Sequence, residues 1–103
     1  MDTTKSYIRV RWIHQDASQP IWLLIELDGE RFETRKIEVF ADGRKGYASE
    51  NEEIGGSILG DQPVPSLSNV SSDPQFVPIE ITRDEFESAW KVRQTSAEPG
   101  NAV

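Results

Sequence analysis

The stretch from Glu33 to Tyr47 constrains the fold more than any other part of the chain. Two runs of residues suited to β-strands flank Asp42-Gly43, and an Asp-Gly pair in this setting is the strongest short-range signal for a β-hairpin. Ile37 and Val39 alternate with charged residues on the way into the turn. The stretch therefore predicts two antiparallel strands, and we expect the rest of the chain to extend or cover them.

Two further strands are expected before this hairpin. Residues 7–12 alternate strictly between a face of aliphatic residues and tryptophan and a face of tyrosine and arginine, which is typical of a half-buried strand. Residues 21–27 are apolar on nearly every position, which favours a central strand covered on both sides. Asp28-Gly29 predicts a second two-residue turn. The four strands would form an antiparallel meander.

The third of these strands has an irregular phase. In a regular strand Phe32 would lie on one face, while Ile37 and Val39 would lie on the other. One extra residue within 33–36 would bring all three to the same side. We therefore predict a β-bulge in this segment.

The clearest local signal is a helix that begins after Thr82. Thr82 and Glu85 have the spacing of a capping box, and Ile81 and Phe86 have that of a hydrophobic staple. The apolar residues Phe86, Ala89 and Trp90 fall on one stripe of such a helix, which must pack on the sheet because a helix of this length is marginal alone.

Residues 49–78 show no periodicity and contain many glycines and prolines. Their apolar side chains argue against disorder, so we expect an irregular loop that wraps the sheet, with one helical turn near residues 66–70. The expected fold is α+β: a single domain over residues 6–93 with a four-stranded antiparallel meander, a long wrapping loop and one C-terminal helix packed on the sheet. Residues 94–103 are predicted to form a disordered C-terminal tail.

Several function classes are poorly supported by the residues. The chain has no cysteine and one histidine, His14, which leaves no thiolate metal site, no thiol nucleophile and no triad. We therefore predict a protein that is not an enzyme and that needs no cofactor or metal. No apolar run follows Met1, so neither a signal peptide nor a membrane span is expected, and a cytoplasmic location is the default.

Charge is distributed unevenly. The formal net charge is −7, and residues 48–103 carry ten acidic and three basic side chains. Such a surface favours cationic partners and opposes nucleic acid, although a moderate negative charge also simply keeps a small protein soluble. The leading hypothesis is a non-catalytic protein-binding module that recognises one basic protein. Its predicted contact residues are Glu50, Glu52, Glu53 and Asp61.

Two alternatives stay open. Tyr7, Arg9, Arg11 and Arg35 could form a basic and aromatic sheet face that binds single-stranded nucleic acid weakly, although cross-strand pairs with glutamates would neutralise it. A small-molecule site could lie under the 49–78 loop, where Trp12 or Trp22 would report a ligand by fluorescence.

Three segments together resemble a family of small bacterial proteins classed as a domain of unknown function. They are Tyr7-Ile-Arg-Val-Arg-Trp12, Lys36-Ile-Glu-Val-Phe-Ala-Asp-Gly43 and Ile81-Thr-Arg-Asp-Glu-Phe-Glu-Ser-Ala-Trp90. The resemblance covers about residues 6–93. It implies a bacterial, soluble, stand-alone domain and carries no functional residue across. In size, acidity and fold class the chain is also similar to the immunity proteins of toxin systems. This analogy predicts one tightly bound basic partner, such as a nuclease toxin.

Overall fold

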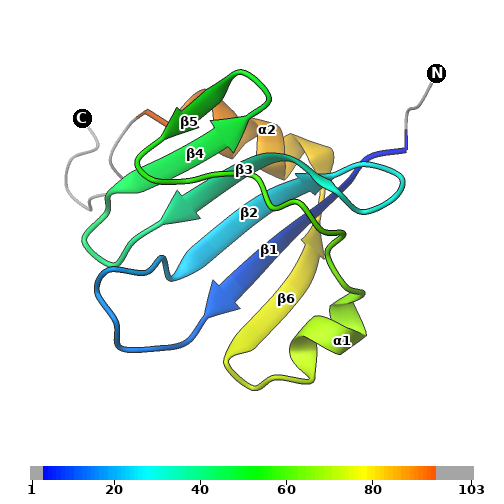
Figure 1. Ribbon diagram of the computed structural model, residues 1–103, viewed down its shortest axis with the longest axis horizontal. Coiled ribbons are helices and arrows are strands. Elements are labelled where there is room, and N and C mark those ends of the chain that lie inside the picture. The colour runs from blue at the N-terminus through cyan, green and yellow to red at the C-terminus, as the bar shows by residue number, and fades with distance from the viewer. Residues whose placement is uncertain (1–3, 95–103) are drawn as a thin grey trace.

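The computed structural model describes residues 4–94, which form one antiparallel sheet of six strands and two helices (Figure 1). Across the sheet the strands lie in the order β5-β4-β3-β2-β1-β6. Along the chain the elements are β1 (Ser6–Trp12), β2 (Trp22–Leu27), β3 (Glu33–Val39), β4 (Lys45–Ser49), β5 (Glu52–Ile54), α1 (Leu67–Ser71), β6 (Phe76–Ile81) and α2 (Arg83–Lys91).

The α+β class and the four predicted strands are confirmed, but the prediction of four strands in total is wrong. Both additional strands begin inside the predicted 49–78 loop. β5 has only three residues, too few to show an alternating pattern. β6 contains Pro78, which removes a ladder donor and argues against a strand unless that strand lies at an edge. The helical turn expected near residues 66–70 is α1, with Ser66 as its N-cap.

Pro78 is tolerated because of the register between β6 and β1. The Ile13 amide donates to the Gln75 carbonyl, and the Trp12 amide donates to the Ile21 carbonyl in the other direction. Backbone bonding alternates along an antiparallel pair, so the odd-numbered residues of β1 bond to β6. Pro78 lies opposite Val10, an even-numbered residue, and its missing donor therefore faces away from the sheet.

Both predicted hairpins form, but each has a loop of three residues where an Asp-Gly turn of two was predicted. Between β3 and β4, the Phe40 amide donates to the Arg44 carbonyl, and Gly43 adopts a φ of 91°. Between β2 and β3 the Asp28 amide likewise donates to the Phe32 carbonyl, and Arg31 adopts a φ of 70° at the position equivalent to Gly43. The Asp28 carboxylate stabilises this loop by accepting from the backbone amides of Glu30 and Phe32.

The predicted β-bulge is confirmed. Leu27 pairs with Glu33, whereas Glu26 pairs with Arg35, so Thr34 is the extra residue in β3. The Thr34 hydroxyl donates to the backbone carbonyl and to the carboxylate of Glu26, 3.1 and 2.8 Å away. The bulge thereby places a polar group beside a buried carboxylate.

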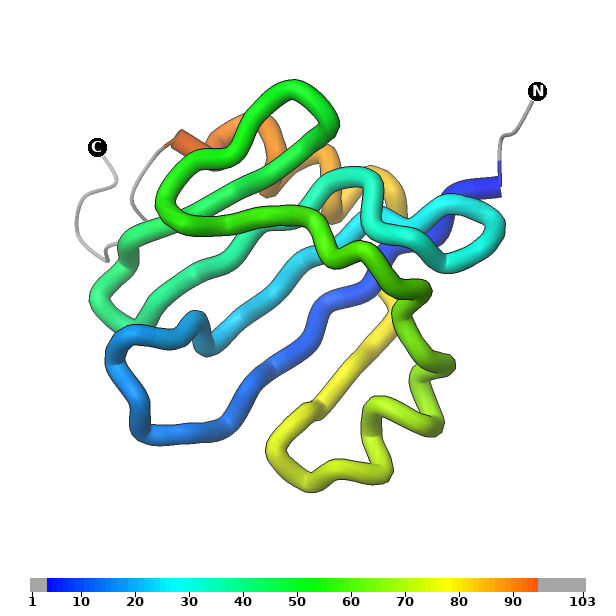
Figure 2. Tube along the Cα trace, viewed as in Figure 1, coloured from blue at the N-terminus to red at the C-terminus, as the bar shows by residue number. Residues whose placement is uncertain are grey.

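The sheet is covered differently on its two faces, as the trace in Figure 2 shows. Helix α2 packs on one face, where Phe86 is fully buried against Tyr7, Ile37, Tyr47 and Ile81. The segment that leads from β5 into α1 crosses the other face, above Ile8, Val10, Ile25 and Leu27. We call these the helix face and the loop face. Each has its own hydrophobic cluster.

Helix α2 begins as its sequence predicts. The Thr82 hydroxyl accepts from the Glu85 amide at 3.1 Å, and the Glu85 carboxylate accepts from the Thr82 amide at 2.9 Å. Of the predicted tail, residues 95–103 lie outside the described residues. Within the described part of the chain, neither helix is long and apolar enough to cross a bilayer.

Candidate functional site

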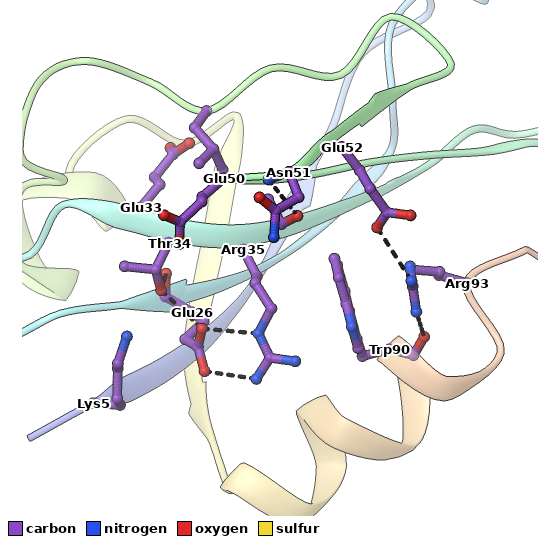
Figure 3. Close-up of a pocket in the computed structure, with 12 residues that line it drawn as sticks. Lys5, Glu26, Glu33, Thr34, Arg35, Glu50, Asn51, Glu52, Trp90 and Arg93 are labelled. Carbon is purple, nitrogen blue, oxygen red and sulfur yellow. Dashed lines mark hydrogen bonds and ion pairs between the residues drawn. The ribbon is translucent and has the colours of Figure 1, made fainter. Parts of the chain in front are cut away.

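A wide cleft of the described structure opens between the bulged end of β3, the turn that joins β4 to β5, and helix α2 (Figure 3). Its volume is about 700 Å³. Charged side chains dominate its lining, which comprises Lys5, Glu26, Glu33, Thr34, Arg35, Ser49, Glu50, Asn51, Glu52, Leu59, Trp90 and Arg93.

Arg35 is the centre of this cleft. Its guanidinium makes two hydrogen bonds to Glu26, at 2.8 and 2.7 Å, and two more to Glu87 of α2, at 3.2 and 2.7 Å. It also lies over the rings of Phe86 and Trp90, with its central carbon 4.9 and 5.0 Å from the ring centroids. Arg35 therefore fastens the helix to the sheet, and four of its five donors are occupied.

The carboxylates around Arg35 stay ionised at neutral pH. Burial alone would raise the pKa of Glu26, but hydrogen bonds from Arg35 and Thr34 outweigh it and bring that pKa to about 2. The hydrogen bond from Arg35 also lowers the pKa of Glu87. A general acid needs a pKa near the working pH, so neither carboxyl suits acid–base catalysis.

Trp90 forms the wall of the cleft near the end of α2. The guanidinium of Arg93 lies 4.2 Å from the centroid of its ring and 3.1 Å from the Glu52 carboxylate. Figure 3 shows this pair bridging α2 and the β4–β5 hairpin. Most of the charged side chains that line the cleft are thus paired with one another by hydrogen bonds and ion pairs.

The structure does not bring the four predicted acidic contact residues together. Glu50 and Glu52 line the cleft, and Glu52 is already paired with Arg93. Glu53 follows Glu52 in β5 and so points to the opposite face of the sheet. Asp61 is exposed in the segment beyond β5, outside the lining of the cleft.

Two of the four residues predicted for a nucleic-acid face are also unavailable. Tyr7 is only 5% exposed and packs on Phe86, with their ring centroids 5.4 Å apart. Arg35 is held by two glutamates, as the predicted cross-strand pairing with Glu26 requires. Arg9 and Arg11 are half-buried and are not held by a carboxylate within ion-pair distance in the described residues.

Those two arginines belong to a part of the helix face that no described element covers. Beyond the row of Tyr7 and Ile81, the register places Arg9 opposite Ile79, and Arg11 opposite Val77 on one side and Trp22 on the other. Ile79 and Val77 are 41% and 49% exposed. We call Arg9, Arg11, Trp22, Val77 and Ile79 the Trp22 surface.

The indole ring of Trp22 packs against both arginines. The guanidinium carbons of Arg9 and Arg11 lie 5.2 and 5.1 Å from the centroid of its indole ring. In the described residues neither arginine forms an ion pair within 4 Å. The alternation of residues 7–12 indicated the two arginines, but the aliphatic half of this surface was missed because β6 was not predicted.

His14 is used structurally. Its Nε2 donates to the Pro20 carbonyl at 2.7 Å, and its Nδ1 accepts from the Asp16 amide at 2.9 Å. Among residues 4–94, no three histidine or acidic side chains gather closely enough to hold a metal ion. Both ring nitrogens thus stabilise the loop between β1 and β2.

Comparison with known proteins gives one match. No curated protein and no solved structure matches the chain significantly. Residues 6–95 match the family model described as a domain of unknown function, DUF6881. Because this match spans most of the 103 residues, the chain belongs to the DUF6881 family.

Proposed function

We propose that this protein is a non-catalytic protein-binding module that docks a partner on the Trp22 surface. The observation that carries the proposal is the composition of this surface: a tryptophan packed against two arginines, bordered by two exposed aliphatic side chains. Tryptophan and arginine are the residues enriched at the energetic centres of protein interfaces. A rigid aromatic side chain also loses little conformational entropy on binding.

The partner is expected to approach the face of the sheet and not its edges. Pro78 removes the central outward-facing donor of β6, and β5 offers only three residues, two of them glutamates. Both features are poor templates for the addition of a strand. Side-chain contacts on the Trp22 surface therefore support the proposal better than strand addition does.

Charge indicates the chemistry of the contact. Arg9 and Arg11 are free of carboxylates within ion-pair distance in the described structure, so a complementary segment would carry acidic side chains beside apolar ones. This proposal differs from the basic partner predicted from the overall charge. The acidic residues Glu50 and Glu53 therefore provide the matched comparison.

The test is affinity capture from a nuclease-treated lysate of the native host, followed by measurement of the purified pair by calorimetry. Three forms are compared: the unaltered protein, the double variant Arg11→Glu/Val77→Ser, and the double variant Glu50→Lys/Glu53→Lys. We expect the first double variant to weaken binding by at least about tenfold, because it removes contacts at the centre of the interface. The second should bind as the unaltered protein does.

The opposite pattern would reject the Trp22 surface and favour a basic partner held by the acidic residues. Capture that occurs in an untreated lysate and is lost after nuclease treatment would instead favour the nucleic-acid alternative. Oligonucleotide binding that falls steeply with salt would support the same conclusion. Circular dichroism of both double variants must match that of the unaltered protein.

A further inference from the structure

A second hollow lies on the loop face, on the other side of the sheet from the Trp22 surface. Its volume is about 370 Å³, within the range of small-molecule sites. The floor consists of aliphatic side chains from β1 and β2, and the walls come from the segment that crosses this face. The lining residues are Ile8, Val10, Leu23, Ile25, Glu33, Val64, Pro65, Asn69, Val70, Asp73 and Phe76.

One wall of this groove is held in place by Arg31. Its Nε donates to the Val64 carbonyl and its guanidinium also donates to the Pro65 carbonyl, both at 2.8 Å, while its own carbonyl accepts from the Val64 amide. Arg31 is the one non-glycine residue between 4 and 94 with a positive φ, 70°. Such a conformation costs free energy and persists only where the surroundings hold it.

The opposite end is held by Gln75. Its carbonyl accepts from the Ile13 amide at 2.8 Å, and its side-chain oxygen accepts from the Trp12 indole at 3.4 Å. Between these two anchors, helix α1 packs the half-buried Leu67 and Val70 against the cluster, and its other residues are exposed. The wall is therefore fixed at both ends and by these two side chains, and a hollow of about 370 Å³ remains beside them, which makes the groove preformed.

The polar groups at the rim are acidic or neutral. The lining contains two carboxylates, one amide and no lysine or arginine. Glu33 is already satisfied by Lys36 at 3.0 Å and by the Gly60 amide at 2.7 Å. Asp73 accepts from the Gln75 amide at 2.9 Å through one oxygen and has no ion-pair partner in the described residues.

We propose that this groove binds a small apolar molecule that carries a protonated amine. The apolar body would lie against Val10, Ile25 and Phe76, and the ammonium group would donate to Asp73 at the rim. Neutral and anionic analogues of the same body gain the apolar contacts without the charged hydrogen bond, and an anionic one is repelled.

The test uses three probes of one shape: phenethylamine, phenethyl alcohol and phenylacetate. Binding to the full-length protein is followed by NMR, using the indole signal of Trp12, whose ring lies 5.7 Å from that of Phe76, and the methyl signals of Val10 and Ile25. We expect saturable millimolar binding with the amine preferred over the alcohol by about threefold, the range of an exposed ion pair, and phenylacetate weakest.

Three variants locate the site. Asp73→Asn keeps the hydrogen bond to Gln75 and should abolish the preference for the amine while the alcohol binds as before. Asn69→Lys, at an exposed position, should weaken the amine and strengthen phenylacetate. Val70→Trp should fill the groove and remove binding of all three probes; Asp84→Asn on α2 is the control.

The proposal is overturned if none of the probes saturates, if phenylacetate binds as well as the amine, or if Asp73→Asn leaves the preference unchanged. Should Val70→Trp not fold, the two rim variants decide the outcome, because both replace exposed side chains.

Discussion

The buried carboxylate of Glu26 makes the stability of the folded protein depend on pH. Its pKa is about 2 in the folded protein, against an ordinary value of 4.5. A carboxyl whose pKa is lowered by folding stabilises the protein at pH values above the unfolded pKa, and this contribution is lost as the pH falls through the folded pKa. The contribution is of the order of 3 kcal/mol at neutral pH.

We therefore expect Glu26→Gln to be destabilised at pH 7 and to lose less stability than the unaltered protein between pH 4.5 and 2. Urea unfolding at several pH values measures both effects. Glu80→Gln, at an exposed position of β6, is the control. Parallel pH profiles for the unaltered protein and Glu26→Gln would contradict this role.

Alanine substitutions at two neighbouring glycines would distinguish the cost of backbone strain from the cost of steric contact. Gly55 and Gly56 have φ values of 71° and 83°, so alanine at either position costs about 1 kcal/mol in the left-handed region. A Cβ at Gly55 would also lie 2.9 Å from the Gly46 Cα, whereas one at Gly56 would meet nothing within 4 Å.

Gly55→Ala should therefore lower the free energy of unfolding by at least about 1 kcal/mol more than Gly56→Ala, since it adds overpacking to the same strain. Chemical denaturation of the two variants measures the difference. Equal losses would show that β4 moves away from the turn at no cost.

At the scale of elements, the two helices differ in how strongly they are coupled to the core. Helix α2 buries Phe86, whereas α1 buries none of its residues, yet both begin with a side-chain cap. Thr82→Ala should cost about 1 kcal/mol of global stability. Ser66→Ala should cost less, because α1 packs only the half-buried Leu67 and Val70 on the core, whereas α2 buries Phe86 completely. Thermal unfolding compares the two variants, and a larger loss in Ser66→Ala would contradict this ranking.

Elements with strong local signals were predictable from the sequence. The capping box of α2, the hairpin around Asp42-Gly43 and even the Thr34 bulge follow from patterns within a few residues. β6 could not be predicted in this way, because Val77 and Ile79 flank Pro78 and only the pairing with β1 makes that proline acceptable. The length of the two hairpin loops was also not predicted, because Phe40 pairs with Arg44 and Asp28 with Phe32, which leaves one loop residue more than an Asp-Gly turn in each hairpin.

The candidate sites were less predictable for a related reason. Arg9 and Arg11 were visible in the sequence, but the Trp22 surface requires knowing that residues 77 and 79 lie beside them. Likewise, the acidic residues near Glu52 are adjacent in sequence and yet diverge, because successive residues of a strand face opposite sides. Sites built from distant strands depend on register, which local patterns do not determine.

At the scale of the whole molecule, the edge of the sheet formed by β6 is protected by the pyrrolidine ring of Pro78. Pro78→Thr would restore an outward-facing donor in the middle of β6. We expect this variant to self-associate at concentrations where the unaltered protein is monodisperse, because an unprotected edge pairs with other edges. Light scattering after size-exclusion chromatography measures it, with Pro63→Thr in the exposed loop as the control. Identical elution of all three would show that Pro78 is not protective.

The pairing of β1 with β6 has a consequence for the order of events during synthesis. The strands from β1 to β5 form a meander in which each pairs with the next, so they can assemble as the chain emerges. The odd-numbered amides of β1 nevertheless wait for a strand that is made about seventy residues later. The nascent chain therefore carries an open edge beside its first strand until residue 81 has left the ribosome, and that interval is when it is most exposed to misassociation.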